Sequence, residues 1–503
     1  NIGKIIKKWL EKIVPNLVGS PGKSSMTTYI TISPAIQNYG ALLVKDWNES
    51  YLPQRTDNYV PQKEEEEKKE EVKCIAWLER LETYKGEFGF DWMRDNYKDI
   101  CENYEELKKE YEQITIEGET YFVPWLSMFP NQENVSLNLK VKITEGNPKN
   151  DDVIKLPSKN GIRFEPNEVK IKDIQKGEVT IKVFCDTPLS KDTKIELLNK
   201  ENHRVGKITV LKNDEIRKLN VKFIKVMDNE VDSINNQRVF SQMPPNWVDE
   251  TIYKFNKCYF NQALIKIKSD GLEEMIIDVD KYVEKGVLKN LVINEVRGIP
   301  RYYNGFDREL YKEYMLKNGE YRGVIFFLSA FQQPDTRQGH GQLYPTEINY
   351  MLMSPEIVGS KSLHSYAHEL GHTLGLDHSW VTIEDNNKRL LQIEKELNIK
   401  REYLYKTKEY PETTPIKNSN EILKDLRLRV NKEIKLYESE KMSRTQFIPK
   451  HPFNKASTEN VMDYNGYDLS DGTEIRNPNQ EGFTFWKWQW QIMRNEVKSY
   501  YGE

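Results

Sequence analysis

The chain has 503 residues, a length that predicts roughly three domains at about 150 residues each. Its 74 basic and 78 acidic residues nearly balance, giving a formal charge of −4, which argues against a general binder of nucleic acid. Hydrophobic residues make up 38% of the chain and charged residues 30%. No apolar run approaches the roughly 18 residues of a membrane span, so we expect no transmembrane segment.

The first part of the chain contains segments of different composition. Residues 1–20 place apolar side chains at helical spacing with lysines between them, which predicts an amphipathic helix. This helix docks either onto the chain's own domain or onto a membrane surface or a partner. Residues 61–73 include the run KEEEEKKEEVK and form a charged linker, either a solvated helix or a mobile segment. The surrounding residues 21–130 predict a helical or mixed module, with helical periodicity over 74–112.

Short alternating segments follow over residues 131–228, separated by turn-rich spacers. They cover residues 135–143, 162–164, 169–171, 179–184, 194–198, 206–211 and 219–226. Such a succession of short strands is typical of an all-β immunoglobulin-like sandwich. Neither this sandwich nor the module before it carries a catalytic motif. The N-terminal half is therefore a candidate docking region for a partner, which would be a delivery apparatus, a surface or a substrate.

Helices and strands alternate in the rest of the chain, residues 238–503, which predicts an α+β domain. Residues 247–260 have a helical pattern. The runs at 324–329 and 348–353 read as a buried strand and a second strand.

One histidine-rich segment of this domain contains residues suited to binding a metal ion. It reads HSYAHELGHTLGLDHSW, in which His368, Glu369, His372, Gly375 and His378 satisfy HExxHxxGxxH. On a helix, His368 and His372 lie one turn apart on the same face, so both imidazoles reach one Zn²⁺. Gly375 is expected to end the helix in a left-handed conformation and to return His378 to the same ion. Three neutral imidazoles leave a coordination position open for water, as in catalytic zinc sites.

Glu369 follows the first ligand directly and is expected to act as general base. Zinc lowers the pKa of a bound water toward about 7, so a carboxylate within hydrogen-bond distance generates the nucleophile at neutral pH. The sequence therefore predicts a zinc-dependent endopeptidase acting on protein or peptide substrates. A non-catalytic binding or delivery module is the alternative, and loss of the Glu369 carboxylate separates the two, because it abolishes only an enzyme's function.

The motif resembles the zinc signature of the metzincin metalloendopeptidases, and HELGHTLGLDHS is especially similar to the matrixin version. Downstream, the string NVMDY that ends at Tyr464 is similar to the Met-turn of the same superfamily. The resemblance implies that Met462 forms a hydrophobic floor under the histidines without bonding the metal. It also implies that Tyr464, like the tyrosine of astacins, stabilises the tetrahedral intermediate. The M-x-Y string looks pappalysin- or cytophagalysin-like as well as astacin-like, so the subfamily stays open.

Two further expectations concern the surroundings of the motif. His378 and Met462 are 84 residues apart (462 − 378), and charged, helically periodic stretches at 383–405 and 422–442 fill much of that distance. They predict a helical insertion over about 381–457, which gates the substrate, binds a partner or only decorates the domain. The strand at 348–353 stands where metzincins place the antiparallel edge strand that pairs with an extended substrate.

Taken as a whole, the sequence predicts a multidomain chain. An α+β metzincin catalytic domain lies at the C-terminus, preceded by the all-β sandwich and by the helical or mixed module. The abundance of Lys, Glu, Ile, Asn and Tyr favours a bacterial source and a secreted or delivered protease or effector.

Overall fold

The computed structural model describes residues 72–501 apart from 134, 178, 231–232, 290–291, 294–295, 298–300, 303–304, 333–338, 342–348, 359–362, 417–421, 447–450, 465–466, 469–472 and 475–481. The amphipathic helix expected at 1–20 and most of the charged linker at 61–73 lie outside these residues. The described residues belong to one compact unit. None of the helices within them has the length and apolar character needed to cross a membrane.

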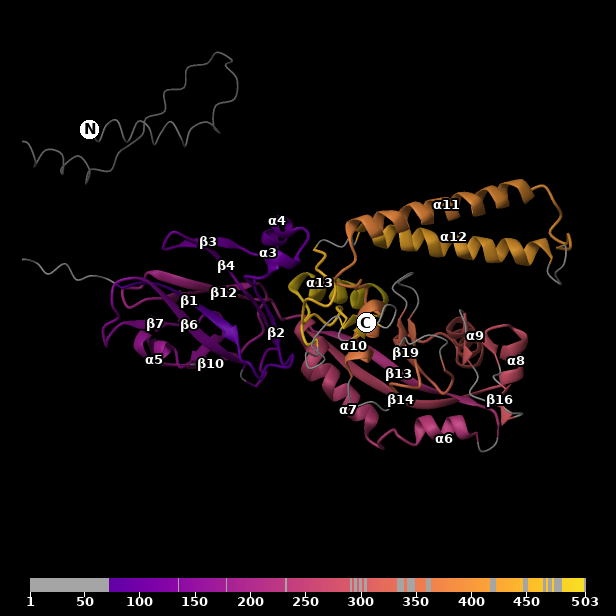
Figure 1. Ribbon diagram of the computed structural model, residues 1–503, viewed down its shortest axis with the longest axis horizontal. Helices are drawn as coiled ribbons and strands as arrows, with labels where there is room; N and C mark the ends of the chain where they lie inside the picture. Colours follow the sequence, from indigo (N-terminus) through magenta and orange to yellow (C-terminus); the bar gives the residue numbers. More distant parts are fainter. Residues whose placement is uncertain are drawn as a thin grey trace, which may run out of the picture. The chain divides into compact units, whose positions relative to one another are not determined.

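Two β-sheets enclose the first core of this unit, and together we call them the sandwich (Figure 1). One sheet has the order β1-β6-β10-β8, with strands β1 (Lys73–Arg80), β6 (Val135–Glu145), β8 (Ile162–Glu165) and β10 (Val179–Cys185). The other has the order β2-β5-β12-β11-β7-β9, with strands β2 (Gly89–Asp91), β5 (Trp125–Ser127), β7 (Val153–Lys155), β9 (Glu168–Lys170), β11 (Thr193–Leu198) and β12 (Arg204–Val210). Alternate side chains, such as Ile181 and Val183, enter the shared core.

The helical periodicity noted over 74–112 does not correspond to a helix at its start. Residues Lys73–Arg80 form β1, which pairs antiparallel with β6. Cys74, Ala76 and Leu78 enter the sandwich core, while Ile75 packs on the outer side in a cluster with residues of a small hairpin. Because both faces of β1 are covered, its apolar residues do not alternate cleanly, and the pattern imitates a helix. The hairpin is β3 (Gln113–Ile116) with β4 (Glu119–Phe122), and helical residues here are confined to α3 (Tyr97–Ile100), α4 (Tyr104–Leu107) and η2 (Lys108–Glu110).

The predicted sandwich boundaries, 131–228, are wrong at both ends. Strands β1, β2 and β5 come before residue 131, and the last predicted strand, β13 (Arg217–Asp228), belongs to a different sheet. β13 pairs in parallel with β14 (Ile265–Ile277) and β19 (Val324–Ser329). The other six predicted strands are present as β6 and β8 to β12. The sheet that follows the sandwich thus begins before residue 238, and the immunoglobulin-like topology stays a prediction.

The sheet that follows the sandwich has the order β14-β13-β19-β21-β20, and its first four strands are parallel. The strand expected at 324–329 is confirmed as β19, whose residues are all buried. Phe326 and its alternate neighbours join the core that contains the apolar residues of α10 (His364–Thr373). Phe327 packs on the opposite face with residues of α8 (Val279–Glu284) and α9 (Phe306–Asn318). A parallel strand covered on both faces reads as an unbroken apolar run.

The edge strand expected at 348–353 is not an edge. Its residues form β21 (Tyr350–Met353), which lies between β19 and β20 (Gly339–Gly341). Within the described residues, β20 is the outermost strand, and it runs antiparallel to β21. A short Gly-rich segment without an apolar pattern therefore supplies the border of the sheet.

The remaining elements are short or peripheral. The helix expected at 247–260 is confirmed as α7 (Trp247–Lys254), continued by η3 (Phe255–Tyr259) and η4 (Phe260–Ala263). Other helices are α5 (Ile171–Lys176), α6 (Ile234–Phe240), α13 (Lys487–Glu496) and η5 (Val497–Tyr501). Two-residue strands are β15 (Leu288–Lys289), β16 (Val292–Ile293), β17 (Val296–Arg297), β18 (Arg301–Tyr302), β22 (Tyr467–Asp468) and β23 (Thr473–Glu474).

The predicted helical hairpin is confirmed as α11 (Ile383–Thr407) and α12 (Leu423–Gln446), which run side by side (Figure 1). A small apolar core joins them, made of Ile393, Leu397, Val430 and Ile434. Near the start of α11, Glu440 accepts hydrogen bonds from Arg389 at 2.8 and 2.9 Å and from Arg444 at 2.9 Å. Arg444 also lies 3.8 Å from Asp377, the residue before His378. The hairpin is thus tied to the loop that carries the third histidine.

Candidate metal centre

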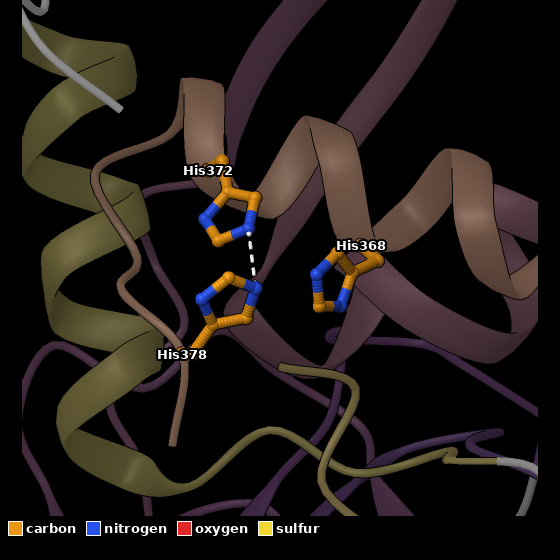
Figure 2. Close-up of side chains that lie close together, drawn as sticks. All are labelled: His368, His372 and His378. Carbon is orange, nitrogen blue, oxygen red and sulfur yellow. Dashed lines mark hydrogen bonds between the residues drawn. The ribbon is translucent and has the colours of Figure 1, made fainter. Parts of the chain in front are cut away.

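Three histidines converge at the C-terminal end of α10 (Figure 2). His368 and His372 project from the helix, and His378 comes from the loop that follows it. The left-handed conformation expected at Gly375 is present, with φ of +85°. Around it, the Leu376 N–H donates to Gly371 O at 3.0 Å and the Gly375 N–H to His372 O at 2.9 Å, which is a Schellman ending. This ending turns the chain so that His378 faces the helix.

The spacing of the three imidazoles fits a single ion. One nitrogen from each ring lies within 4.8 Å of the others, and His372 Nε2 is 3.2 Å from His378 Nε2. Tetrahedral zinc with Zn–N bonds of about 2.0–2.1 Å sets neighbouring nitrogens about 3.3 Å apart. The nitrogens of His372 and His378 therefore have the separation that a shared zinc ion requires.

Backbone carbonyls set the orientation of the two helical imidazoles. His368 Nδ1 lies 2.8 Å from Val461 O, and His372 Nδ1 lies 2.7 Å from Leu376 O. A carbonyl oxygen only accepts, so each Nδ1 carries the proton and each Nε2 is the nitrogen with the lone pair, as in a metal-ligating imidazole.

Two of the imidazoles, those of His368 and His378, are also held neutral. Burial, followed by the neighbouring His372 and His364, holds the pKa of His368 well below its usual value. Burial, followed by His368 and Lys455, lowers the pKa of His378 to about 3. Neutral imidazole is the form that binds metal, so these two ligands need no deprotonation at neutral pH.

Glu369 lies against the outermost strand of the sheet. Its Oε2 accepts a hydrogen bond from the Gly341 N–H of β20. The approach is close, since a Cβ at Gly341 would lie 2.5 Å from Glu369 O and one at Gly339 would lie 2.9 Å from Glu369 Cγ. Only glycines allow β20 to cross the helix at this distance.

Met462 lies in a turn, residues 459–464, that packs against the same helix. Its side chain is fully buried, and a Cβ at Gly371 would lie 2.5 Å from Met462 Sδ. The Asp463 carboxylate holds the turn by accepting hydrogen bonds from Ala456 N at 2.7 Å, Thr458 N at 2.9 Å and Thr458 Oγ1 at 2.7 Å. The predicted floor residue therefore contacts the helix between the two ligands that this helix carries.

Aromatic rings form a wall beside the third histidine. The Tyr464 ring centroid lies 4.9 Å from that of His378 and 6.0 Å from that of His368, and the residue is 39% exposed. Sequence reasoning missed two neighbours. Trp380 stacks on His378 at 4.8 Å, and the Lys455 ammonium lies 5.2 Å from the Trp380 ring centroid and 5.1 Å from the Tyr464 ring centroid. Trp380 follows the motif by two positions, but nothing in the sequence singled out Lys455.

The comparisons with known proteins place no constraint on this centre. No family model matches the chain, and no curated protein matches it. A solved structure described as "Structure of a chaperone-substrate complex" aligns at 13% identity with a TM-score of 0.19, over 40% of this chain and 28% of that chain. The aligned part spans less than a third of that protein, and so low a score carries no argument about fold or function.

Proposed function

We propose that this chain is a zinc-dependent endopeptidase of the metzincin type. The observation that carries the proposal is the convergence of three imidazoles, with Nδ1 of each of the helical pair against a backbone carbonyl. Three nitrogen ligands on a helix and its following loop are a donor set that zinc prefers in catalytic sites. Glu369, which follows the first histidine, and Met462, which is buried against Gly371 of the same helix, add support.

The chain's own groups divide the work of hydrolysis. Zinc, when bound, supplies Lewis acidity that lowers the pKa of water and polarises the scissile carbonyl. The Glu369 carboxylate takes the proton of the attacking water and then gives it to the leaving amine. The Gly341 N–H holds that carboxylate in place. The partly exposed Tyr464 phenol donates a hydrogen bond to the substrate oxygen as negative charge develops on it.

The substrate in this proposal is a protein or peptide in extended form. β20 is the outermost described strand beside Glu369, so an extended segment that pairs with it lies next to the general base. Pairing of this kind reads the peptide backbone, and the side-chain preferences then come from the aromatic wall of Trp380 and Tyr464.

The test pairs metal content with hydrolysis. Wild type, Glu369→Gln and the control Glu384→Gln are purified without chelator, and zinc is measured by mass spectrometry. Each is then given an unbiased peptide mixture, and cleavage products are identified. Glu384 is an exposed residue of α11 whose carboxylate pairs with Lys388, so it matches the chemical change away from the centre.

We expect one zinc per chain in all three proteins, with hydrolysis slowed by about 10²- to 10⁴-fold only in Glu369→Gln. Zinc bound without cleavage by the wild type would favour a binding or delivery module over an enzyme. A wild type that retains no zinc would contradict the metal centre itself.

A further inference from the structure

The sandwich contacts the 459–464 turn through one carboxylate. Glu459 Oε1 accepts hydrogen bonds from Arg80 Nη2 at 2.6 Å and from Arg94 Nη2. Arg80 ends β1, and Arg94 lies between β2 and α3. The three side chains are only 15%, 17% and 22% exposed, so solvent screens these ion pairs less than it screens surface pairs. A sandwich strand, β1, and the segment that follows strand β2 therefore hold the same side chain.

Both guanidinium groups are themselves fixed in place. Their Cζ atoms lie 4.5 Å (Arg80) and 4.1 Å (Arg94) from the centroid of the Trp92 ring. Arg94 also donates to the Tyr97 hydroxyl, which accepts a further hydrogen bond from Trp486 Nε1 at 3.0 Å. Planar guanidinium groups stacked on aromatic rings lose little further freedom when they bind a carboxylate. The contact is thus preorganised, unlike a pair of mobile surface side chains.

Two backbone steps and one hydrogen bond connect Glu459 to the first histidine. The Glu459 carbonyl accepts hydrogen bonds from Phe483 N at 3.0 Å and Thr484 N at 3.2 Å, and Val461 N donates to Thr484 O at 2.9 Å. Two residues beyond Glu459, Val461 O faces His368 Nδ1 at 2.8 Å. A shift of Glu459 therefore moves the carbonyl that orients the imidazole.

An apolar cluster closes the same interface. Tyr97, Cys101, Leu107 and Tyr111 precede most of the sandwich in the chain, and they pack with Phe453 and Trp486 from the C-terminal part. In addition, Lys487 N donates to Asp91 Oδ2 at 2.9 Å. The two parts of the unit thus meet through buried side chains on either side of the turn.

We propose that Arg80 and Arg94 are positioning residues for His368, acting through Glu459 and the Val461 carbonyl. The inference rests on the proposed metal centre and extends it, because it makes the sandwich part of that centre's support rather than only a docking region. Groups that orient a metal-bound imidazole through its second nitrogen change metal affinity by about 10- to 100-fold when removed. Arg80 and Arg94 do not contact the imidazole directly but act through Glu459 and Val461. We therefore expect removal of both to weaken metal affinity by about tenfold.

The experiment compares full-length variants loaded with zinc or cobalt. The variants are Arg80→Met/Arg94→Met, Glu459→Gln and the conservative Arg94→Lys. The control is Arg163→Met, because Arg163 also binds two carboxylates, Asp186 at 2.9 Å and Glu165, and stacks on Phe184 at 3.7 Å in the same sandwich. Zinc dissociation constants are measured by competition with a chromophoric chelator. The visible spectrum of the Co²⁺ form reports ligand geometry, and thermal midpoints of the metal-free proteins report stability.

We expect the double variant to bind zinc about tenfold more weakly and to show an altered Co²⁺ spectrum. The single variant Arg94→Lys keeps most of the wild-type zinc affinity. The control Arg163→Met leaves zinc affinity and the Co²⁺ spectrum unchanged, even where its thermal midpoint falls. A folded double variant with wild-type affinity and spectrum overturns the inference. If the double variant does not fold, Glu459→Gln decides the matter by the same two measurements. A wild type that binds no zinc overturns the metal centre, which is a different failure from equal binding by wild type and variants.

Discussion

Glu496 supplies a sharp test of the electrostatics around the centre. It is the last residue of α13 and is 4% exposed, and its Oε2 has no hydrogen-bond partner among the described residues. Burial raises the pKa of this carboxyl to about 7 from an ordinary value of 4.5. The side chain also packs at Gly375, where a Cβ would lie 2.9 Å from Glu496 Cγ. We predict that Glu496→Gln stabilises the protein at alkaline pH.

The sign and size of this stability change follow from the pKa of Glu496 in the folded and in the unfolded chain. The folded state binds the Glu496 proton more tightly than the unfolded state, so this contribution to stability is full below pH 4.5 and is lost as the pH rises through 7. At 1.36 kcal/mol per pKa unit, the wild type loses about 2.5 kcal/mol of unfolding free energy from this group between pH 5 and pH 8.5. Glutamine is neutral throughout and loses nothing, so the variant gains that amount relative to the wild type.

The assay is urea unfolding of the metal-free chain at pH 5 and pH 8.5, followed by tryptophan fluorescence. Trp490, fully buried on the same helix, is one of the ten tryptophans that contribute to this signal. Glu384→Gln serves as the exposed control for the same chemical change. A difference between Glu496→Gln and wild type that stays constant from pH 5 to pH 8.5 would refute the reasoning.

Three further outcomes are expected. Gly341→Ala places a Cβ 2.5 Å from Glu369 O, so hydrolysis falls by about tenfold or more while zinc content is unchanged; full activity would contradict a role for this close approach. Glu440→Gln leaves Arg389 and Arg444 without their buried carboxylate and costs about 3 kcal/mol, seen as faster amide hydrogen exchange in α11 and α12; unchanged exchange would argue against the network. Removal of zinc by a chelator lowers the thermal midpoint, and re-addition restores it. Free zinc at 100 times its dissociation constant stabilises the folded chain by about 2.7 kcal/mol. A midpoint independent of zinc would count against the centre.

Local pattern was enough for much of the secondary structure. The strands from β6 and β8 to β12, the buried strand β19 and the two helices of the hairpin stand at or near their predicted positions. The left-handed Gly375 was also predictable, because a helix that must return His378 to its own end face needs a residue that tolerates positive φ. These features depend on residues close together in the chain.

The partners of the strands were not predictable in the same way. β13 has the same alternating pattern as the sandwich strands, yet it pairs with β14 and β19 in the other sheet. β1 looked helical because its second face is covered by the hairpin of β3 and β4. β20 carries no apolar pattern and became the outer strand because its glycines allow contact with Glu369. In each case the deciding contact comes from a distant part of the chain.

The sequence by itself determined four groups of the proposed chemistry, His368, Glu369, His372 and His378, because helical spacing and one glycine place them on one helix and the loop that follows it. Only the tertiary structure decided what supports them. Arg94 and Arg80 reach Glu459 across 365 and 379 positions of sequence, and the carbonyl that orients His368 lies 93 positions away. Such contacts arise when separately formed elements bury their surfaces together, and no local periodicity records which surfaces meet.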